Sequence, residues 1–140
     1  MTKQEIIGQF VAELGLEHIH LIRHDFRLMR GFAPDGEHTV NIEQKLIRAR
    51  QKKTALSVDY GFEVVCARDG NTVWKASYAY RVALNFAKPE TIKAVMDDEE
   101  LKNVFSNRQM IQFLWPYLRQ ELQNDTSRAG IPVFLLPPRK

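Results

Sequence analysis

The stretch LSVDYGFEVVCARDGNTVWKASYAYRVALNF, residues 56–86, decides the fold of this chain. Each half alternates apolar and polar side chains, which is the period of a half-buried β-strand. Asp69-Gly70 lies between the two halves and is a strong signal for a hairpin turn. The stretch therefore predicts two long antiparallel strands joined by a tight turn.

The length of the turn decides whether the two apolar rows share a face of the sheet. A two-residue loop sets Phe62 opposite Ser77 and puts the rows on opposite faces. A three-residue loop, which adds Asn71, sets Phe62 opposite Tyr78 and puts both rows on one face. Because a slip of one residue moves a whole row to the other face, we predict the three-residue loop, with Gly70 or Asn71 at positive φ.

Upstream of the hairpin, the pattern indicates one helix and two more strands. Thr2-Lys3-Gln4-Glu5 fits a capping box, and apolar residues follow at helical spacing, so we expect a helix over about residues 3–14. Residues 16–32 look extended, with a bulge near Leu21-Ile22. Pro34-Asp35-Gly36 marks a turn. A second strand, about Thr39–Lys53, is apolar early and basic late.

Downstream of Phe86 the pattern is helical. Pro89 suits a first helical turn, and the acidic run 97–100 suits the start of a short helix. Ser106 and Gln109 form a second capping-box pattern, after which a long amphipathic helix runs to about Thr126. We predict an α+β fold: a four-stranded, meandering antiparallel sheet with an N-terminal helix and a long C-terminal helix, and with the helices on one face.

Composition indicates one soluble domain spanning residues 1–140. The net charge is +3, the hydrophobic fraction is 44%, and no run of about 18 apolar residues could span a membrane. The N-terminus lacks an apolar signal core, and the single cysteine, Cys66, does not suggest a disulfide framework. We therefore expect a cytoplasmic protein without a membrane partner.

Two motifs stand near the C-terminal end: Trp115-Pro116-Tyr117-Leu118-Arg119, and Ser127-Arg128-Ala129-Gly130-Ile131-Pro132. Proline lacks an N–H, so Pro116 either opens a helix in its first turn or kinks a longer one. Gly130 is suited to end that helix in a left-handed conformation. Pro132 then favours an extended Leu/Pro tail.

These motifs, together with the order of elements, resemble the C-terminal part of SecB-type export chaperones. The residues that carry the resemblance lie within 54–138, and the motif positions are Trp115, Pro116, Tyr117, Arg119, Ser127, Arg128, Gly130 and Pro132. The Trp-Pro-Tyr variant looks closer to atypical SecB-like proteins, some of which guard antitoxins in toxin–antitoxin systems. In typical members the Pro-Tyr-x-Arg motif opens the long helix.

The resemblance implies an ATP-independent chaperone, or holdase, that needs no catalytic residue and no cofactor. Its partners would be unfolded client polypeptides or an antitoxin, and its copies would assemble as a dimer of dimers. Typical members serve protein transport, are acidic, and continue into a segment that helps dock the translocation ATPase. Because this chain is mildly basic and ends at Lys140, we do not expect that ATPase as a partner.

Client binding of this kind needs apolar grooves with a polar rim. The aromatic residues are the candidates, although any one of them is more typical of a core. Phe62, Trp74 and Tyr78 are expected to pack under the long helix. Residues at helix ends or on the tail are better placed to line an open groove. The candidate client-binding set is Phe105, Tyr117, Phe134, Phe62, Trp74 and Tyr78.

Other chemistries find less support. The basic strand segment Arg48–Lys53 could bind phosphates as part of a nucleic-acid-binding module, but acidic residues are interspersed and no such motif is present. His18, His20 and His24 are close in sequence, yet no cysteine or acidic set nearby completes a metal site, so none is predicted. No nucleophile or phosphate-loop motif points to an enzyme.

Overall fold

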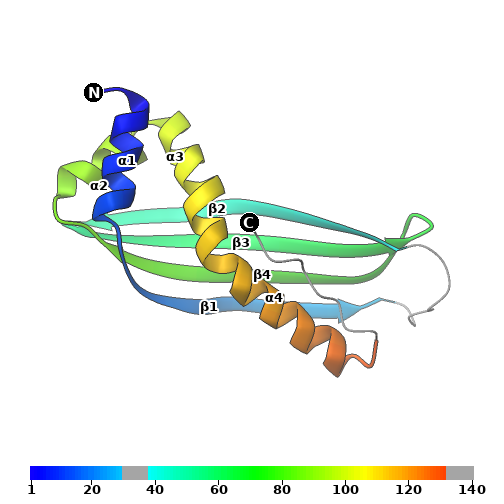
Figure 1. The fold of residues 1–140 in the computed structure, drawn as a ribbon. Helices are drawn as coiled ribbons and strands as arrows, with labels where there is room; N and C mark the ends of the chain where they lie inside the picture. The colour runs from blue at the N-terminus through cyan, green and yellow to red at the C-terminus, as the bar shows by residue number, and fades with distance from the viewer. Residues whose placement is uncertain (30–37, 132–140) are drawn as a thin grey trace.

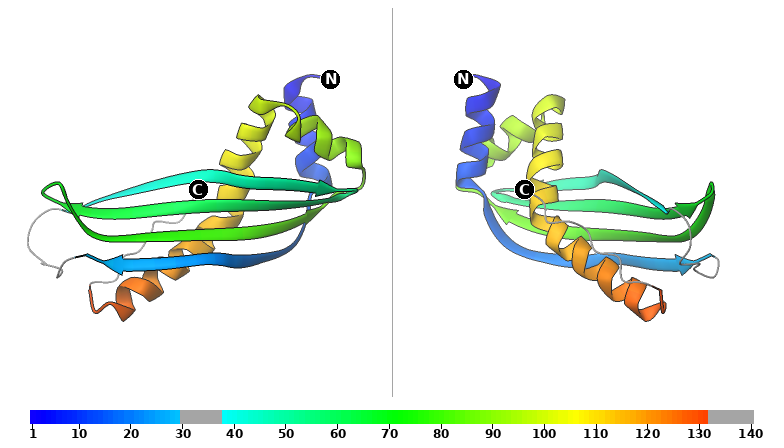
Figure 2. Two further views of the ribbon diagram at one scale, coloured as in Figure 1. Left: turned by 180° about the vertical axis from the view of Figure 1, so that it is seen from behind. Right: turned by 45° about the vertical axis from the view of Figure 1, so that its right-hand side comes forward.

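The structure is a computed structural model, and it describes residues 1–29 and 38–131. The turn expected at residues 34–36, the extended tail, Pro132 and Phe134 lie outside these ranges. Within them the chain forms one sheet; the long C-terminal helix crosses one face of it, and the shorter helices gather at one end, as Figures 1 and 2 show.

The sheet contains four antiparallel strands: β1 (Gly15–Leu28), β2 (Thr39–Lys52), β3 (Ala55–Arg68) and β4 (Asn71–Asn85). Their order across the sheet is β1-β4-β3-β2, so β1 and β2 are the two edges. The expected simple meander is therefore wrong for β1, which pairs with β4 instead of β2. The predicted bulge near Leu21-Ile22 is confirmed, because the β1–β4 register shifts between Leu21 and Arg23.

The β3–β4 hairpin has the predicted register but reaches it by a different route. Phe62 faces Tyr78, as expected, yet the loop has two residues and not three. Asp69 and Gly70 have φ of 51° and 78°, and positive φ at both central residues is the hairpin geometry that matches strand twist. The register shifts between Cys66 and Ala67, which leaves one extra residue on β4. This bulge restores the pairing of Phe62 with Tyr78.

The helices gather at one end of the sheet, and the last of them crosses its face. The N-terminal helix α1 (Lys3–Glu13) has the predicted capping box at Thr2 and Glu5. The short helices α2 (Pro89–Met96) and α3 (Glu99–Phe105) follow β4, and Asp98 caps α3. A π-helical turn (η1, Ser106–Met110) and the long helix α4 (Ile111–Arg128) then run across the sheet (Figure 1).

The long helix does not begin where the sequence suggested. Ser106 makes no capping box: its hydroxyl donates to the Lys102 carbonyl, and its backbone is helical, so α3, η1 and α4 follow without a break. Pro116 lies inside α4 and does not open it. Gly130, at φ 72°, ends the helix as predicted, and Gly130 N–H and Ile131 N–H donate to the Ser127 and Thr126 carbonyls in a Schellman motif.

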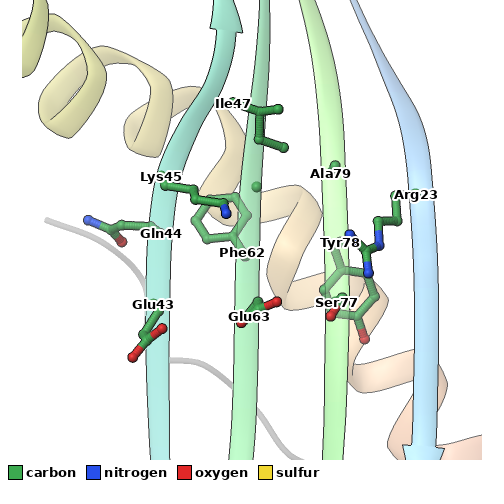
Figure 3. A pocket seen from close by; sticks show the side chains of 11 residues that line it. Arg23, Glu43, Gln44, Lys45, Ile47, Phe62, Glu63, Ser77, Tyr78 and Ala79 are labelled. Atoms are coloured by element: carbon green, nitrogen blue, oxygen red, sulfur yellow. The ribbon is translucent and has the colours of Figure 1, made fainter.

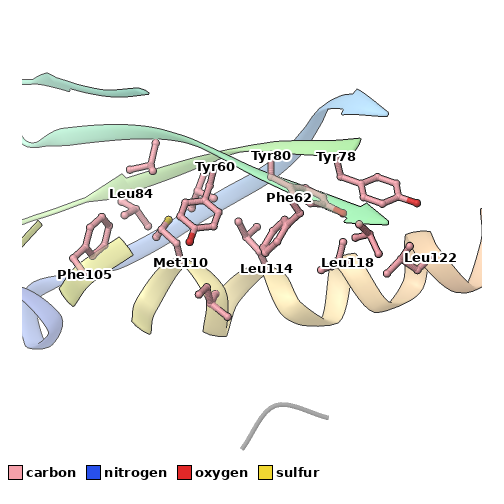
Figure 4. Packing of buried hydrophobic residues seen from close by; sticks show 14 of the residues in the cluster. Tyr60, Phe62, Tyr78, Tyr80, Leu84, Phe105, Met110, Leu114, Leu118 and Leu122 are labelled. Carbon is pink, nitrogen blue, oxygen red and sulfur yellow. The ribbon is translucent and has the colours of Figure 1, made fainter. Parts of the chain in front are cut away.

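The core lies between α4 and the sheet face that it crosses (Figure 4). The apolar row of β3 and the apolar row of β4 both point to this face, which follows from the hairpin register. From the helix side, Leu114, Leu118 and Leu122 recur at a spacing of four and are fully buried. At the other end, Phe10 of α1 packs against Phe86 and Phe105.

Candidate functional site

The β1 edge of the sheet exposes a row of apolar side chains. We call it the β1-edge strip; each member is between 39% and 53% exposed, and its residues are Leu16, Leu21, Ile22, Leu28 and Met29. An edge strand also leaves backbone N–H and C=O groups without a neighbouring strand. Both features suit an extended polypeptide, which could add to the sheet edge and bury its own apolar side chains.

Tyr117 extends this apolar surface onto α4. Its side chain is 47% exposed, and its ring lies 6.1 Å from the ring of Tyr80, measured between centroids. Tyr80 is the register partner of Leu21, so Tyr80 and Leu21 point to the same sheet face. Tyr117 therefore lies on the same side of the sheet as Leu21 of the β1-edge strip.

The other aromatic residues proposed for client binding are placed differently. Phe62, Trp74 and Tyr78 are buried on the sheet face under α4, in agreement with the core position expected of them. Phe105 was expected at an open groove, but it is 0% exposed. The reason is that the end of α3 faces α1, where Phe105 packs edge-on against Phe10. A client could reach these four side chains only if the core opened.

The C-terminal motif residues are distributed around α4 and its end. Trp115 is half-buried and packs against the core, while Pro116 is exposed and Arg119 partly so. Ser127 and Arg128 are exposed in the last turn, and Arg128 lies 4.0 Å from a carboxylate oxygen of Asp125. Gly130 forms the helix end described above. The motif thus marks a helix and its stop, and does not gather into one site.

A polar cluster that the sequence did not reveal joins β1 to α4. The buried carboxylate of Asp125 accepts a hydrogen bond from the Tyr78 hydroxyl at 2.6 Å, and it lies 2.7 Å from His24 Nε2. His24 stacks on Tyr78, with ring centroids 5.5 Å apart. Burial, and then the Asp125 hydrogen bond, raise the pKa of Tyr78 far above its usual value. Residues 101 positions apart form this contact, so spacing along the chain could not have predicted it.

The opposite face of the sheet has a shallow hollow of about 430 Å³ (Figure 3). Gly61 and Ala79 form its floor, and Ile47 leans over Gly61. Charged side chains of both signs surround it: Arg23, Lys45, Glu43 and Glu63. The floor of the hollow is therefore apolar and its rim is charged.

The basic segment Arg48–Lys53 forms the last part of β2 and includes the residue that follows the strand. It has an acidic neighbour on β3. Asp59 on β3 is the register partner of Arg48, and it accepts two hydrogen bonds from Arg81 at 2.8 and 3.0 Å. The Arg81 hydrogen bond, and after it the charges of Arg81, Arg50 and Arg48, hold the pKa of Asp59 below its ordinary range. This carboxylate offsets the positive potential that phosphate binding needs.

Two further candidate groups remain, the thiol of Cys66 and the histidine pair on β1. Cys66 is buried on the core face, where burial raises the pKa of its thiol and suppresses the reactive thiolate. His18 and His20 lie side by side on β1, with ring centroids 4.5 Å apart. Among the helices that the structure describes, none is both long and apolar enough to cross a membrane.

Comparison with known proteins identifies the fold. No family model and no curated protein matches the chain. Among solved structures, the chain is similar to the SecB-like chaperone Rv1957 of Mycobacterium tuberculosis, solved in complex with a ChAD peptide from the Rv1956 HigA1 antitoxin. The TM-score is 0.78 at 16% sequence identity, over 99% of this chain and 100% of that one. A protein of unknown function from Streptococcus agalactiae is more distant, with a TM-score of 0.44 at 11% identity, over 89% and 97%.

The chain therefore has the SecB-like α+β fold, as the sequence resemblance predicted. The similarity spans both the part in which the motifs lie and the N-terminal part, where only the order of elements matched. The resemblance erred in one respect: the Pro-Tyr-x-Arg motif lies within the long helix and does not begin it.

Proposed function

We propose that this protein is an ATP-independent chaperone that holds unfolded or partly folded polypeptides. The observation that carries the proposal is the SecB-like fold over 99% of the chain, because the similar Rv1957 protein was solved with an antitoxin peptide bound. The exposed β1-edge strip supports it, since unfolded clients present apolar side chains and unpaired backbone groups.

The test is suppression of aggregation. A chemically denatured enzyme that aggregates on dilution is diluted into buffer with or without the chain, and light scattering is followed without nucleotide. We expect scattering to fall as the chain approaches the client's concentration, and ATP to have no effect. Unchanged scattering at a several-fold excess of the chain would contradict the proposal.

Tyr117 is the member of the predicted client-binding set that is open to solvent among the described residues. We propose that it contacts the client, because aromatic anchors contribute strongly at binding surfaces. Tyr117→Ser should weaken suppression, whereas Gln120→Ser, at an exposed position on the same helix, should not. Equal effects of the two variants would assign client binding elsewhere.

We propose further that the client class includes antitoxins and that the copies assemble as a dimer of dimers. Weak contacts repeated over several copies add through effective concentration, which suits long flexible clients. Multi-angle light scattering should give the mass of a tetramer. Titration of a labelled antitoxin segment against the chain, with a scrambled segment as control, tests the client class. Equal binding of the two segments would indicate a holdase that does not prefer antitoxins.

A further inference from the structure

The polar cluster between β1 and α4 brings together three groups that can ligate a metal ion. His24 offers Nε2, and Glu121 and Asp125 offer carboxylate oxygens, all within 4.8 Å of one another. Glu121 and Asp125 stand four residues apart on α4 and so project from one side of the helix. His24 comes from β1, so the set bridges two elements that are distant in sequence.

The surroundings hold two of these ligands in place. The Tyr78 hydroxyl donates to Asp125 Oδ2 at 2.6 Å, and the Tyr78 ring stacks on His24. Partners of this kind orient metal ligands and are as important to affinity as the ligands themselves. Asp125 is 5% exposed, so its carboxylate is largely withdrawn from water and is a strong attractor for a cation.

A second buried hydroxyl lies beside the set. The Tyr80 hydroxyl has no hydrogen-bond partner among the described residues, and Tyr80 is 1% exposed. Glu121 and Asp125 are close enough for their charges to raise the pKa of Tyr80 further, after the larger effect of burial. Such an orphaned donor beside a carboxylate is a feature that calls for a partner.

We propose that His24, Glu121 and Asp125 form a binding site for one divalent transition-metal ion, Zn²⁺ in particular, which fastens β1 to α4. One imidazole and two carboxylates suit zinc, which takes ligands at about 2.0–2.2 Å and accepts water in a remaining position. The ion takes the place of the direct His24–Asp125 contact, and the 2.7 Å between Nε2 and Oδ2 widens to about 3.4 Å in a tetrahedral arrangement. Arg128, 4.0 Å from Asp125 and largely exposed, swings into solvent.

The experiment uses the full chain, with any affinity tag removed and metal stripped by a chelator. Zn²⁺ is titrated by calorimetry, and thermal unfolding is followed with and without the ion. We expect one Zn²⁺ per chain and a rise in Tm, since an ion that binds only the folded state stabilises it. Mg²⁺, which prefers all-oxygen sites, should bind far more weakly.

Variants identify the ligands. Glu121→Gln keeps the size of a partly exposed side chain, so its fold is retained, and it should weaken Zn²⁺ binding at least tenfold and abolish the Tm rise. His24→Gln should do the same. The double variant His18→Gln/His20→Gln is the matched control, because that histidine pair is the rival zinc site on β1, and it should bind as the wild type does.

The proposal is overturned if no saturable binding occurs at micromolar Zn²⁺, if Glu121→Gln binds normally, or if the His18/His20 variant loses the ion. Co²⁺ gives an independent readout, because visible absorption bands of a four- or five-coordinate site should appear in the wild type and be missing in Glu121→Gln.

Discussion

The two edges of the sheet have the same length and the same kind of irregularity, but the β1 edge exposes more apolar side chains. Each edge strand has 14 residues, and each has a register shift at an isoleucine, Ile22 on β1 and Ile47 on β2. The two side chains are 44% and 50% exposed. Three further exposed large apolar residues of β1 (Leu16, Leu21 and Leu28), with Met29 directly after the strand, accompany the isoleucine, whereas on β2, all of which the structure describes, Ile47 is the one exposed large apolar residue.

Charged residues on an edge strand discourage pairing with other chains, and a long apolar edge invites it. β2 is therefore the better protected edge and β1 the more open one. The edges also differ in how they are tied to the helices: the cluster of His24, Tyr78 and Asp125 links β1 to α4, while Gln51 of β2 donates to the Pro89 carbonyl at 3.1 Å. We infer that β1, the edge that the cluster links to α4, is the edge that binds polypeptides.

The largest effect is expected from a charge on the open edge. Ile22→Lys removes apolar area that a client would bury and should weaken client binding about tenfold, the equivalent of about 1.4 kcal/mol. Ile47→Lys is the matched control, with the same substitution at a similarly exposed bulge on the other edge. Half-maximal suppression of aggregation should rise for the first variant and stay unchanged for the second; the reverse result would exchange the roles of the edges.

A smaller effect, on stability, should come from the link between β1 and α4. Tyr78→Phe removes one of the two hydrogen-bond partners of the buried Asp125 carboxylate, the other being His24, and should lower the free energy of unfolding by about 1–3 kcal/mol. Tyr80→Phe should be close to neutral in the presence of a chelator, because its hydroxyl has no hydrogen-bond partner in the described part of the chain. Urea denaturation measures the free energy of unfolding of both variants. Equal losses would show that the removal of a buried hydroxyl, and not of its hydrogen bond to Asp125, lowers the stability.

The smallest effect should come from the charged side of the sheet, at Asp59. Arg81 lowers the pKa of Asp59 in the folded state below its ordinary 3.8, so the pair adds stability above that value. The contribution is lost as pH falls through the lowered pKa. Asp59→Asn should thus reduce the free energy of unfolding by less than about 1 kcal/mol at pH 7, because Arg81 is half exposed. The difference from wild type should vanish at a pH below the lowered pKa of Asp59, and a pH-independent difference would contradict the assignment.

Local patterns predicted the elements well where one physical rule acted alone. The capping box at Thr2, the alternating rows of β3 and β4 and the glycine stop at Gly130 all depend on neighbours within a few residues. The failures occurred where two rules competed. Ser106 fits a cap by sequence, but a continuous helix buries Phe105, Ser106 and Met110 in the core, and that burial outweighs a cap.

The hairpin shows the same limit in another form. The requirement that both apolar rows face the core gave the correct pairing of Phe62 with Tyr78, because burial of two rows is worth far more than any turn preference. It could not distinguish a longer loop from a tight loop with a bulge, since both restore the register. Asp69-Gly70 takes the tight turn, and the strand absorbs the extra residue.

The sequence by itself determined the SecB-like class of fold, the helix and strand content and the face of the central hairpin that is buried, because these follow from local periodicity and from motifs. Only the tertiary structure decided which strand became the open edge and which distant side chains meet. Pairing β1 with β4 moved an apolar strand to the rim of the sheet and carried His24 to Asp125. Contacts of that range depend on how whole elements pack, and no spacing along the chain records them.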